Sequence, residues 1–271
     1  MSTSLAHVSI KEVDLVLKVL EHYGVKLEHL AMILVNESYA RKVALAFRQG
    51  ETAGVIHYRV AQQEMGANFF GPAEWSDHYG LQFSKGQLRK IAGFPYSIEL
   101  LNSPCPFNEG KLIKETHFAF LGLDRFKDKP LTIMEWQKIH PALGQPRFYD
   151  SVSYCWYAKD DFCINEVLRF RWYLVLIKIV PNSESMIFEE QLRLLPEAYC
   201  PLRAIEEVTK AMLFFKKNGI YLNQYRYACC SSLASNGDQV RAGRFNSLGL
   251  SIYYRYGNDR DDKVGVGAVR K

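Results

Sequence analysis

The sequence holds few side chains in arrangements that could carry out catalysis. Cys229 and Cys230 are adjacent, and Glu115 and His117 lie two residues apart in the stretch KETH. Adjacent cysteines rarely chelate one metal ion well, and His117 leads into an apolar run, where a hydrogen-bonded structural histidine is the commoner role. HExxH, GxSxG and glycine-rich phosphate loops do not occur. These residues favour a non-enzymatic protein with no catalytic residue, cofactor or metal site.

Recognition chemistry is concentrated in the segment from Gly219 to Lys271. It holds eight Lys or Arg and four Asp and is rich in Tyr, Ser, Asn and Gly. Antibody paratopes use these residue types because Tyr supplies contact area at a low entropic cost. Arg and Tyr also contact phosphates and stack on bases, so a nucleic-acid-binding protein is an alternative. Nucleic acid is the less favoured partner, because Asp259, Asp261 and Asp262 lie among the arginines and would repel a phosphate backbone.

Amino-acid usage changes in the same part of the chain. All 18 Glu lie at or before Glu207, and none occurs in the remaining 64 residues. Trp ends at Trp172 and Met at Met212, and only two Lys and two Gln occur from Gly219 onward. A codon AAC or AAT that is randomised at its two adenines encodes most amino acids but never Glu, Lys, Gln, Met or Trp. The depletion matches that exclusion.

The segment Tyr227 to Lys271, with the preceding stretch PLRAIEEVTKAMLFFKKNGIYL, resembles the C-terminal half of variable proteins encoded by diversity-generating retroelements. Roughly the last 70 residues match well, and GANFFG and KETHFAFL match more loosely. Tyr256 occupies a position where the family has an invariant Trp. The positions that match the fixed frame of the family are Cys230, Ser235, Gly237, Val240, Gly243, Phe245, Gly249, Leu250, Arg260, Gly265, Val266, Arg270 and Lys271.

The resemblance implies a C-type-lectin-like fold of the formylglycine-generating-enzyme-like subclass. It also implies a variable region over about 227–263, in which adenine-specific mutagenic reverse transcription rewrites one ligand-binding face. The expected ligand is a macromolecule, either a protein or a glycan. The positions expected on this variable face are Cys229, Ser231, Ser232, Asn236, Asp238, Arg241, Arg244, Asn246, Ser247, Ser251, Tyr253, Tyr254, Arg255, Asn258, Asp259 and Asp261.

Two further alternatives follow from the same resemblance. One is an enzyme like the formylglycine-generating enzymes, in which Cys229 and Cys230 would correspond to a copper-dependent cysteine pair. The other is a calcium-dependent lectin. The stretch GNDRDD is poorly suited to a hard cation, because Arg260 interrupts its acidic run and no Glu is present nearby.

Helical periodicity characterises residues 1–95, which we expect to form a helical N-terminal region. Ser9 and Glu12 fit a capping box, apolar residues then recur at helical spacing, and Gly24 is suited to end the helix. Shorter helices are expected over 56–64, 72–78 and 85–91.

Residues 96–271 have the pattern of an α+β domain. The apolar runs THFAFLGL and WYLVLIKIV predict buried strands. GLSIYYRY and VGVGAVRK alternate with a period of two, which predicts two more strands. Helices are expected over 132–139, 188–195 and 202–217.

Strand alternation also predicts which C-terminal side chains face the core. The expected core residues are Val240, Phe245, Leu250, Ile252, Val264 and Val266. The residues expected to be exposed on one face are Arg241, Arg244, Ser251, Tyr253, Tyr254, Asn258 and Asp259.

Composition limits the remaining possibilities. No run of about 18 apolar residues predicts a membrane span, and the N-terminus lacks the pattern of a secretory signal. The expected location is therefore the cytoplasm or a phage particle. The six cysteines form no C-x-x-C pair, so most are expected to be small buried apolar residues.

Overall fold

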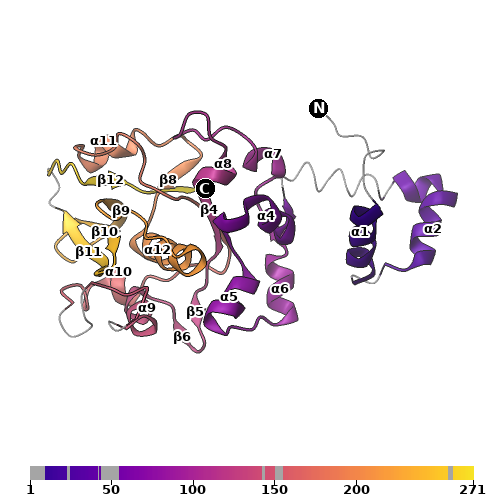
Figure 1. The fold of residues 1–271 in the computed structure, drawn as a ribbon, viewed down its shortest axis with the longest axis horizontal. Helices are drawn as coiled ribbons and strands as arrows, with labels where there is room; N and C mark the ends of the chain where they lie inside the picture. The colour runs from indigo at the N-terminus through magenta and orange to yellow at the C-terminus, as the bar shows by residue number, and fades with distance from the viewer. Residues whose placement is uncertain are drawn as a thin grey trace. The chain divides into compact units, whose positions relative to one another are not determined.

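The computed structural model describes residues 10–22, 25–41, 43, 55–141, 144–149, 155–255 and 259–271. The chain divides into two compact units, Met1–Gly54 and Val55–Lys271, and Figure 1 labels most of their helices and several of their strands. The first unit contains α1 (Ile10–His22) and α2 (Leu27–Val35). The predicted N-terminal helix is therefore confirmed, while its expected cap Ser9 and stop Gly24 lie outside the described residues.

The expected domain boundary near residue 95 is wrong, because the second unit begins at Val55. Strand β2 (Phe69–Phe70) pairs in parallel with β4 (His117–Leu121), and its two phenylalanines are fully buried. This pairing places residues 56–95 within the larger unit. The three short helices expected there are present, except that residues 56 and 57 form a strand. The elements of this stretch are β1 (Ile56–His57), α4 (Tyr58–Met65), α5 (Pro72–Tyr79), α6 (Lys85–Ile91) and β3 (Gly93–Phe94).

Two sheets form the framework of the second unit. The larger sheet has five strands in the order β2-β4-β7-β13-β8, and the smaller has four in the order β11-β10-β9-β12. The second unit is thus mixed α and β with separate sheets, which is compatible with the predicted α+β class. The strands not yet bounded are β7 (Trp172–Leu176), β8 (Tyr199–Pro201), β9 (Tyr227–Leu233), β10 (Gln239–Asn246), β11 (Gly249–Arg255), β12 (Val264–Val266) and β13 (Ala268–Arg270).

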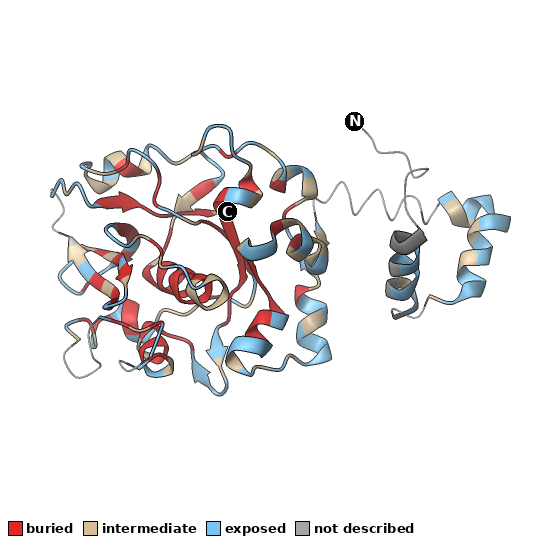
Figure 2. Cartoon of the chain, viewed as in Figure 1, coloured by how far each residue is buried: buried red, intermediate tan, exposed pale blue. Residues whose placement is uncertain are grey.

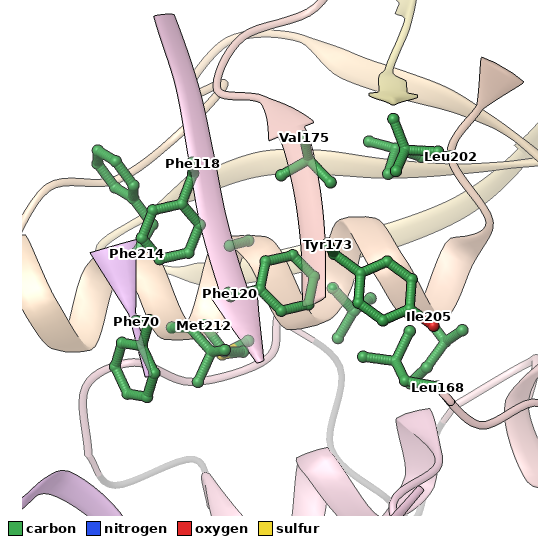
Figure 3. Packing of buried hydrophobic residues seen from close by; sticks show 14 of the residues in the cluster. Phe70, Phe118, Phe120, Leu168, Tyr173, Val175, Leu202, Ile205, Met212 and Phe214 are labelled. Atoms are coloured by element: carbon green, nitrogen blue, oxygen red, sulfur yellow. The ribbon is translucent and has the colours of Figure 1, made fainter. Parts of the chain in front are cut away.

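Helix α12 (Ala204–Asn218) lies at the centre of the core and is buried from Ala204 to Phe214 (Figure 2). It packs against strands of both sheets. Figure 3 shows Met212 and Phe214 beside Phe118 and Phe120 of β4. The helix ends at Gly219, whose positive φ of 67° suits a left-handed cap.

A buried ion pair connects α12 to its surroundings. Lys210 Nζ lies 2.6 Å from Glu207 Oε2 and donates a hydrogen bond of 3.2 Å to the carbonyl oxygen of Leu176 in β7. Asn223 Nδ2, which lies ahead of β9, donates to Glu207 Oε1 at 3.2 Å. Burial raises the pKa of the Glu207 carboxyl. These contacts fix α12 against β7 and the approach to β9.

Short elements complete the unit. The helices α9 and α11 confirm two predicted helices, although α11 ends three residues earlier than expected. None of the helices in the described ranges is long and apolar enough to cross a membrane. The remaining elements are α7 (Ile98–Leu101), α8 (Ile113–Thr116), β5 (Arg125–Phe126), β6 (Lys129–Pro130), α9 (Ile133–Ile139), α10 (Asp161–Ile164) and α11 (Phe188–Leu192).

Candidate ligand-binding face

The four-stranded sheet separates the C-terminal side chains into two sets. Arg241 of β10 is paired with Tyr253 of β11, and the next pair along is Ala242 with Ile252. Because successive residues point to opposite faces of a sheet, Arg241 and Tyr253 share one face, and Ile252 faces the core around α12. All six residues predicted to lie in the core are buried: Val240, Phe245, Leu250, Ile252, Val264 and Val266.

Arg241 is the centre of the outer face. Its guanidinium carbon lies 4.9 Å from the ring centroid of Tyr227 and 5.0 Å from that of Tyr253. Its Nη1 donates a hydrogen bond of 2.9 Å to Asp261 Oδ2. These contacts leave the Arg241 side chain only 13% exposed, so the expectation that it is freely exposed is wrong. Arg241 instead fixes the relative positions of two tyrosine rings.

The row of rings continues beyond Arg241 in both directions. The Arg244 guanidinium lies 6.0 Å from the Tyr227 ring centroid, and Arg244 is exposed. At the other end the Tyr253 and Tyr254 rings stack with an interplanar angle of 3° and a centroid separation of 5.2 Å. We call the set Arg244, Tyr227, Arg241, Tyr253 and Tyr254 the tyrosine–arginine row.

The Tyr254 side chain is less exposed to solvent than predicted. It is paired with Val240, so its backbone position belongs to the core-facing set, and its side chain packs against the core at half exposure. Its ring meets Trp156 in an edge-to-face contact at 5.0 Å. Tyr253, on the outer face, is 46% exposed. The two adjacent tyrosines are therefore not equivalent contact residues.

Trp156 is a site residue that the sequence analysis missed. Its Nε1 donates a hydrogen bond of 3.2 Å to the carbonyl oxygen of Ile252 in the edge strand β11, and its side chain is 37% exposed. It also contacts Tyr253 at 6.3 Å. Trp156 lies in a turn almost one hundred residues before β11, and no periodicity connects the two segments. Tyr227 was not among the expected face residues either, and it is only 8% exposed, so its ring supports Arg241 from beneath and offers little surface to a ligand.

Two expected face residues, Cys229 and Ser232, are buried. Cys229 points to the same side of the sheet as Arg241, but it packs with Val264 and Phe188 in a small apolar cluster. Ser232 Oγ accepts a hydrogen bond from the Ala204 amide at 3.0 Å and donates one to a carboxylate oxygen of Glu166 at 3.0 Å. Neither side chain is available to a ligand, so both assignments are corrected.

The polar residues of the two hairpin turns lie at opposite ends of β10. Asn236 and Asp238 bond to each other in the β9–β10 turn, and Asn246 Oδ1 accepts from the Leu248 amide in the β10–β11 turn. Eight residues of extended strand span about 25 Å. The structure therefore spreads these positions along the whole length of the sheet and does not gather them into one small site.

The remaining expected residues flank the row. Ser231 and Ser247 are exposed, Ser251 is half-buried and accepts from the Tyr227 hydroxyl at 3.4 Å, and Asp259 is exposed. The side chain of Arg255, although its backbone belongs to β11, and the whole of Asn258 lie outside the described residues, as does Tyr256.

Hydrogen bonds to main-chain atoms hold β11 and the β10–β11 turn in place. The side chains of Gln145 and Arg147 both donate hydrogen bonds of 2.9 Å to the carbonyl oxygen of Ser247. Tyr149 and Leu250 are joined by a backbone hydrogen bond of 2.9 Å. Gly249, with a φ of 124°, allows the backbone of residues 148 and 149 to approach so closely that a Cβ would collide with it. None of these contacts depends on the side chain at position 247.

The residues considered for catalysis are buried or hydrogen-bonded within the fold. Cys229 and Cys230 lie on opposite faces of β9, and burial raises the pKa of the Cys230 thiol. The His117 ring is fully buried between Thr116 Oγ1 at 3.0 Å and the Tyr199 hydroxyl at 3.1 Å, and burial lowers its pKa to about 4. Glu115 accepts from the Leu112 amide at the start of α8. Within the described ranges, no group of three or more His, Cys, Asp or Glu could hold a metal ion.

Comparison of the chain with protein-family models, curated protein sequences and solved structures finds no match.

Proposed function

We propose that this chain is a ligand-binding protein of C-type-lectin-like fold whose C-terminal face is diversified by a retroelement. The face binds a macromolecular ligand, a protein or a glycan, and acts by binding and not by catalysis. The observation that carries the proposal is the tyrosine–arginine row on a sheet whose opposite side is buried and whose edge is held by main-chain atoms. Such a sheet keeps its shape when exposed side chains on its outer face are exchanged.

The composition of the row supports recognition of a macromolecule. Tyrosine and arginine are the residue types that contribute most to binding energy at protein interfaces, and rigid rings lose little entropy on binding. The rings of Tyr227 and Tyr253 are already fixed by Arg241 before any ligand arrives. Preorganisation of this kind lowers the entropic cost of association.

The charges of the face favour this function over nucleic-acid binding. Arg241, Arg244 and Arg260 are the described arginines of this face that could contact phosphates, and Arg241 and Arg260 are already in ion pairs. Arg241 is bonded to Asp261, and Arg260 Nη2 lies 2.7 Å from Glu190 Oε1. A phosphate backbone would have to displace these carboxylates before it released counterions.

The genomic neighbourhood of the coding sequence tests the diversification directly. We expect a reverse-transcriptase gene nearby, together with a near-copy of the segment that encodes residues 227–263. In the near-copy, adenines should occupy the codons of exposed face positions such as Ser231, Ser247 and Tyr253, while the codons of Val240 and Phe245 should be identical in both copies. A neighbourhood without such a near-copy would refute the retroelement part of the proposal.

Binding by the face is tested separately, by selecting ligands from a displayed protein or glycan library against the intact chain. We expect selected ligands to lose at least about 2 kcal/mol of binding free energy when Tyr253 is replaced by Ala. Lys85→Ala, at an exposed position in α6 outside the sheet, is the matched control and should have no effect. Ligands that are insensitive to Tyr253→Ala would refute the assignment of the face.

A further inference from the structure

A pocket lies apart from the four-stranded sheet. It has a volume of about 350 Å³ and lies between the end of α6, strand β3 and the start of β7. Its lining residues include Lys90, Tyr96, Arg171, Trp172 and Lys271, and none of the lining residues belongs to strands β9 to β12. Small-molecule sites usually have volumes of about 300 to 1,000 Å³, so the pocket fits a compact ligand and not a polymer.

The walls of the pocket are aromatic and firmly held. Trp172 is 4% exposed and its Nε1 donates a hydrogen bond of 2.9 Å to the carbonyl oxygen of Ile91. Tyr96 is 7% exposed and its hydroxyl donates to the carbonyl oxygen of Arg270 at 3.4 Å. Phe94 contacts both rings, at 5.5 Å and 5.2 Å. Trp172 and Tyr96 are almost fully buried and form the fixed base of the pocket, while the half-buried Phe170 in the lining supplies the accessible ring.

The rim of the pocket is positively charged. Lys90, Arg171 and Lys271 are all exposed, and no carboxylate of the described residues lies within 4.0 Å of their side-chain nitrogens. The Arg171 guanidinium lies 4.7 Å from the ring centroid of Tyr173, which restricts its position. The lining residues include no Asp or Glu. The pocket thus combines a fixed aromatic wall with the cationic side chains of Lys90 and Arg171, neither of which has a carboxylate of the described residues at salt-bridge distance.

We infer that this pocket binds a small phosphate monoester that carries a planar aromatic ring. A phosphate monoester has a charge of about −1.5 to −2 at neutral pH, which matches two cationic side chains in one lining better than a single carboxylate does. The aromatic wall supplies a stacking surface for the planar group. This inference does not depend on the proposed function, because the two sites share no residue.

Isothermal titration calorimetry with adenosine 5′-monophosphate as the probe tests this inference on the full chain. We expect the monophosphate to bind at least about tenfold more tightly than adenosine or inorganic phosphate, since each of those lacks one of the two contacts. Lys90→Gln and Arg171→Gln should each raise the Kd about fivefold, the effect of losing about 1 kcal/mol of charge attraction. Lys85→Gln, at an exposed lysine on the same helix but outside the pocket lining, is the control and should leave the Kd unchanged.

Three outcomes would overturn the inference. Equal affinities for the monophosphate and inorganic phosphate would show that the aromatic wall takes no part. A Kd that is unchanged in Lys90→Gln and Arg171→Gln, or changed equally in Lys85→Gln, would place the binding elsewhere. Absence of any binding heat with the unmodified chain at millimolar probe would exclude the site. Lys90 has no hydrogen bond or ion pair with other described side chains, so Lys90→Gln should keep the melting temperature of the parent chain and separate loss of binding from loss of folding.

Discussion

Phe245 provides the sharpest test of the division between a fixed frame and an exchangeable face. Its ring is fully buried and packs against Phe215 at 5.6 Å and Tyr221 at 4.9 Å, so it joins β10 to the end of α12. Removing a buried phenylalanine ring costs about 3 to 5 kcal/mol, because apolar contacts are lost and a cavity remains. For a domain of this size, about 2 to 4 °C of melting temperature corresponds to 1 kcal/mol. Phe245→Ala should therefore lower the melting temperature by roughly 6 to 20 °C.

The matched comparison is a triple exchange on the outer face, at Ser231, Ser247 and Tyr253. The two serines are exposed, and Tyr253 would lose its contact with Arg241 and its stacking on Tyr254, each worth about 0.5 to 1 kcal/mol at an exposed site. The triple variant should therefore lose less than about 2 kcal/mol in total. Urea unfolding followed by circular dichroism measures both variants under identical conditions. Equal losses of unfolding free energy in Phe245→Ala and the triple variant would refute the distinction.

Three further predictions concern the core and the charge of the molecule. Burial lowers the pKa values of His117 and His140 to about 4, so both are neutral in the folded state and protonate first in the unfolded chain. The stability that these neutral histidines contribute is complete above about pH 6.5 and is lost as the pH falls toward 4, by up to about 3 kcal/mol each. A urea unfolding midpoint that does not change between pH 7 and pH 4 would contradict this prediction. Lys210→Met should lower the free energy of unfolding by about 3 to 5 kcal/mol, because it leaves Glu207 buried without its partner, and adding Glu207→Leu should recover part of that loss. If urea unfolding shows that the two substitutions lower the stability additively, the pair does not act as a unit. Random-sequence DNA should bind more weakly than about 10⁻⁶ M at 0.15 M salt, and tighter binding in a filter assay that Arg244→Gln abolishes would favour the nucleic-acid alternative.

Local sequence patterns were sufficient to predict the elements and the core of the C-terminal region. Val240 and Ile252 are buried as predicted, because a strand with one face on the core must alternate and a shift of one residue would expose every apolar side chain. Helix α12 was predictable because its apolar residues recur at helical spacing and Gly219 closes it, although it begins two residues later than predicted, since Pro201 belongs to β8. The short strand β2 was not predictable, since two residues give no periodic signal and its parallel partner β4 lies nearly fifty residues later.

The face was predicted less accurately than the core, because its contacts join segments that are far apart in the sequence. Alternation places Cys229 on the same side of the sheet as Arg241, but it cannot reveal that Phe188, from a helix forty residues earlier, covers that position. Trp156 was not predicted to be part of the face, because it belongs to an irregular segment that contacts the edge strand β11 only in the folded chain. The sequence did not reveal the charge balance of the face either, because the ion pair of Arg241 with Asp261 joins residues that lie before and after strand β11.

The Arg241–Asp261 pair sets a limit on how freely the face can be rewritten. Arg241 is held by two rings and a carboxylate, and Asp261 also accepts a hydrogen bond from the Lys263 amide at 2.8 Å. Replacing either partner alone breaks this ion pair while the remaining side chain is still partly buried, at 13% exposure for Arg241 and 25% for Asp261, which costs about 1 to 3 kcal/mol. Fully exposed positions such as Ser247 carry no comparable cost, because Gln145 and Arg147 hold the backbone there and not the side chain. Under the proposed function, this interdependent centre would preserve the shape of the face, while the exposed positions around it could change independently.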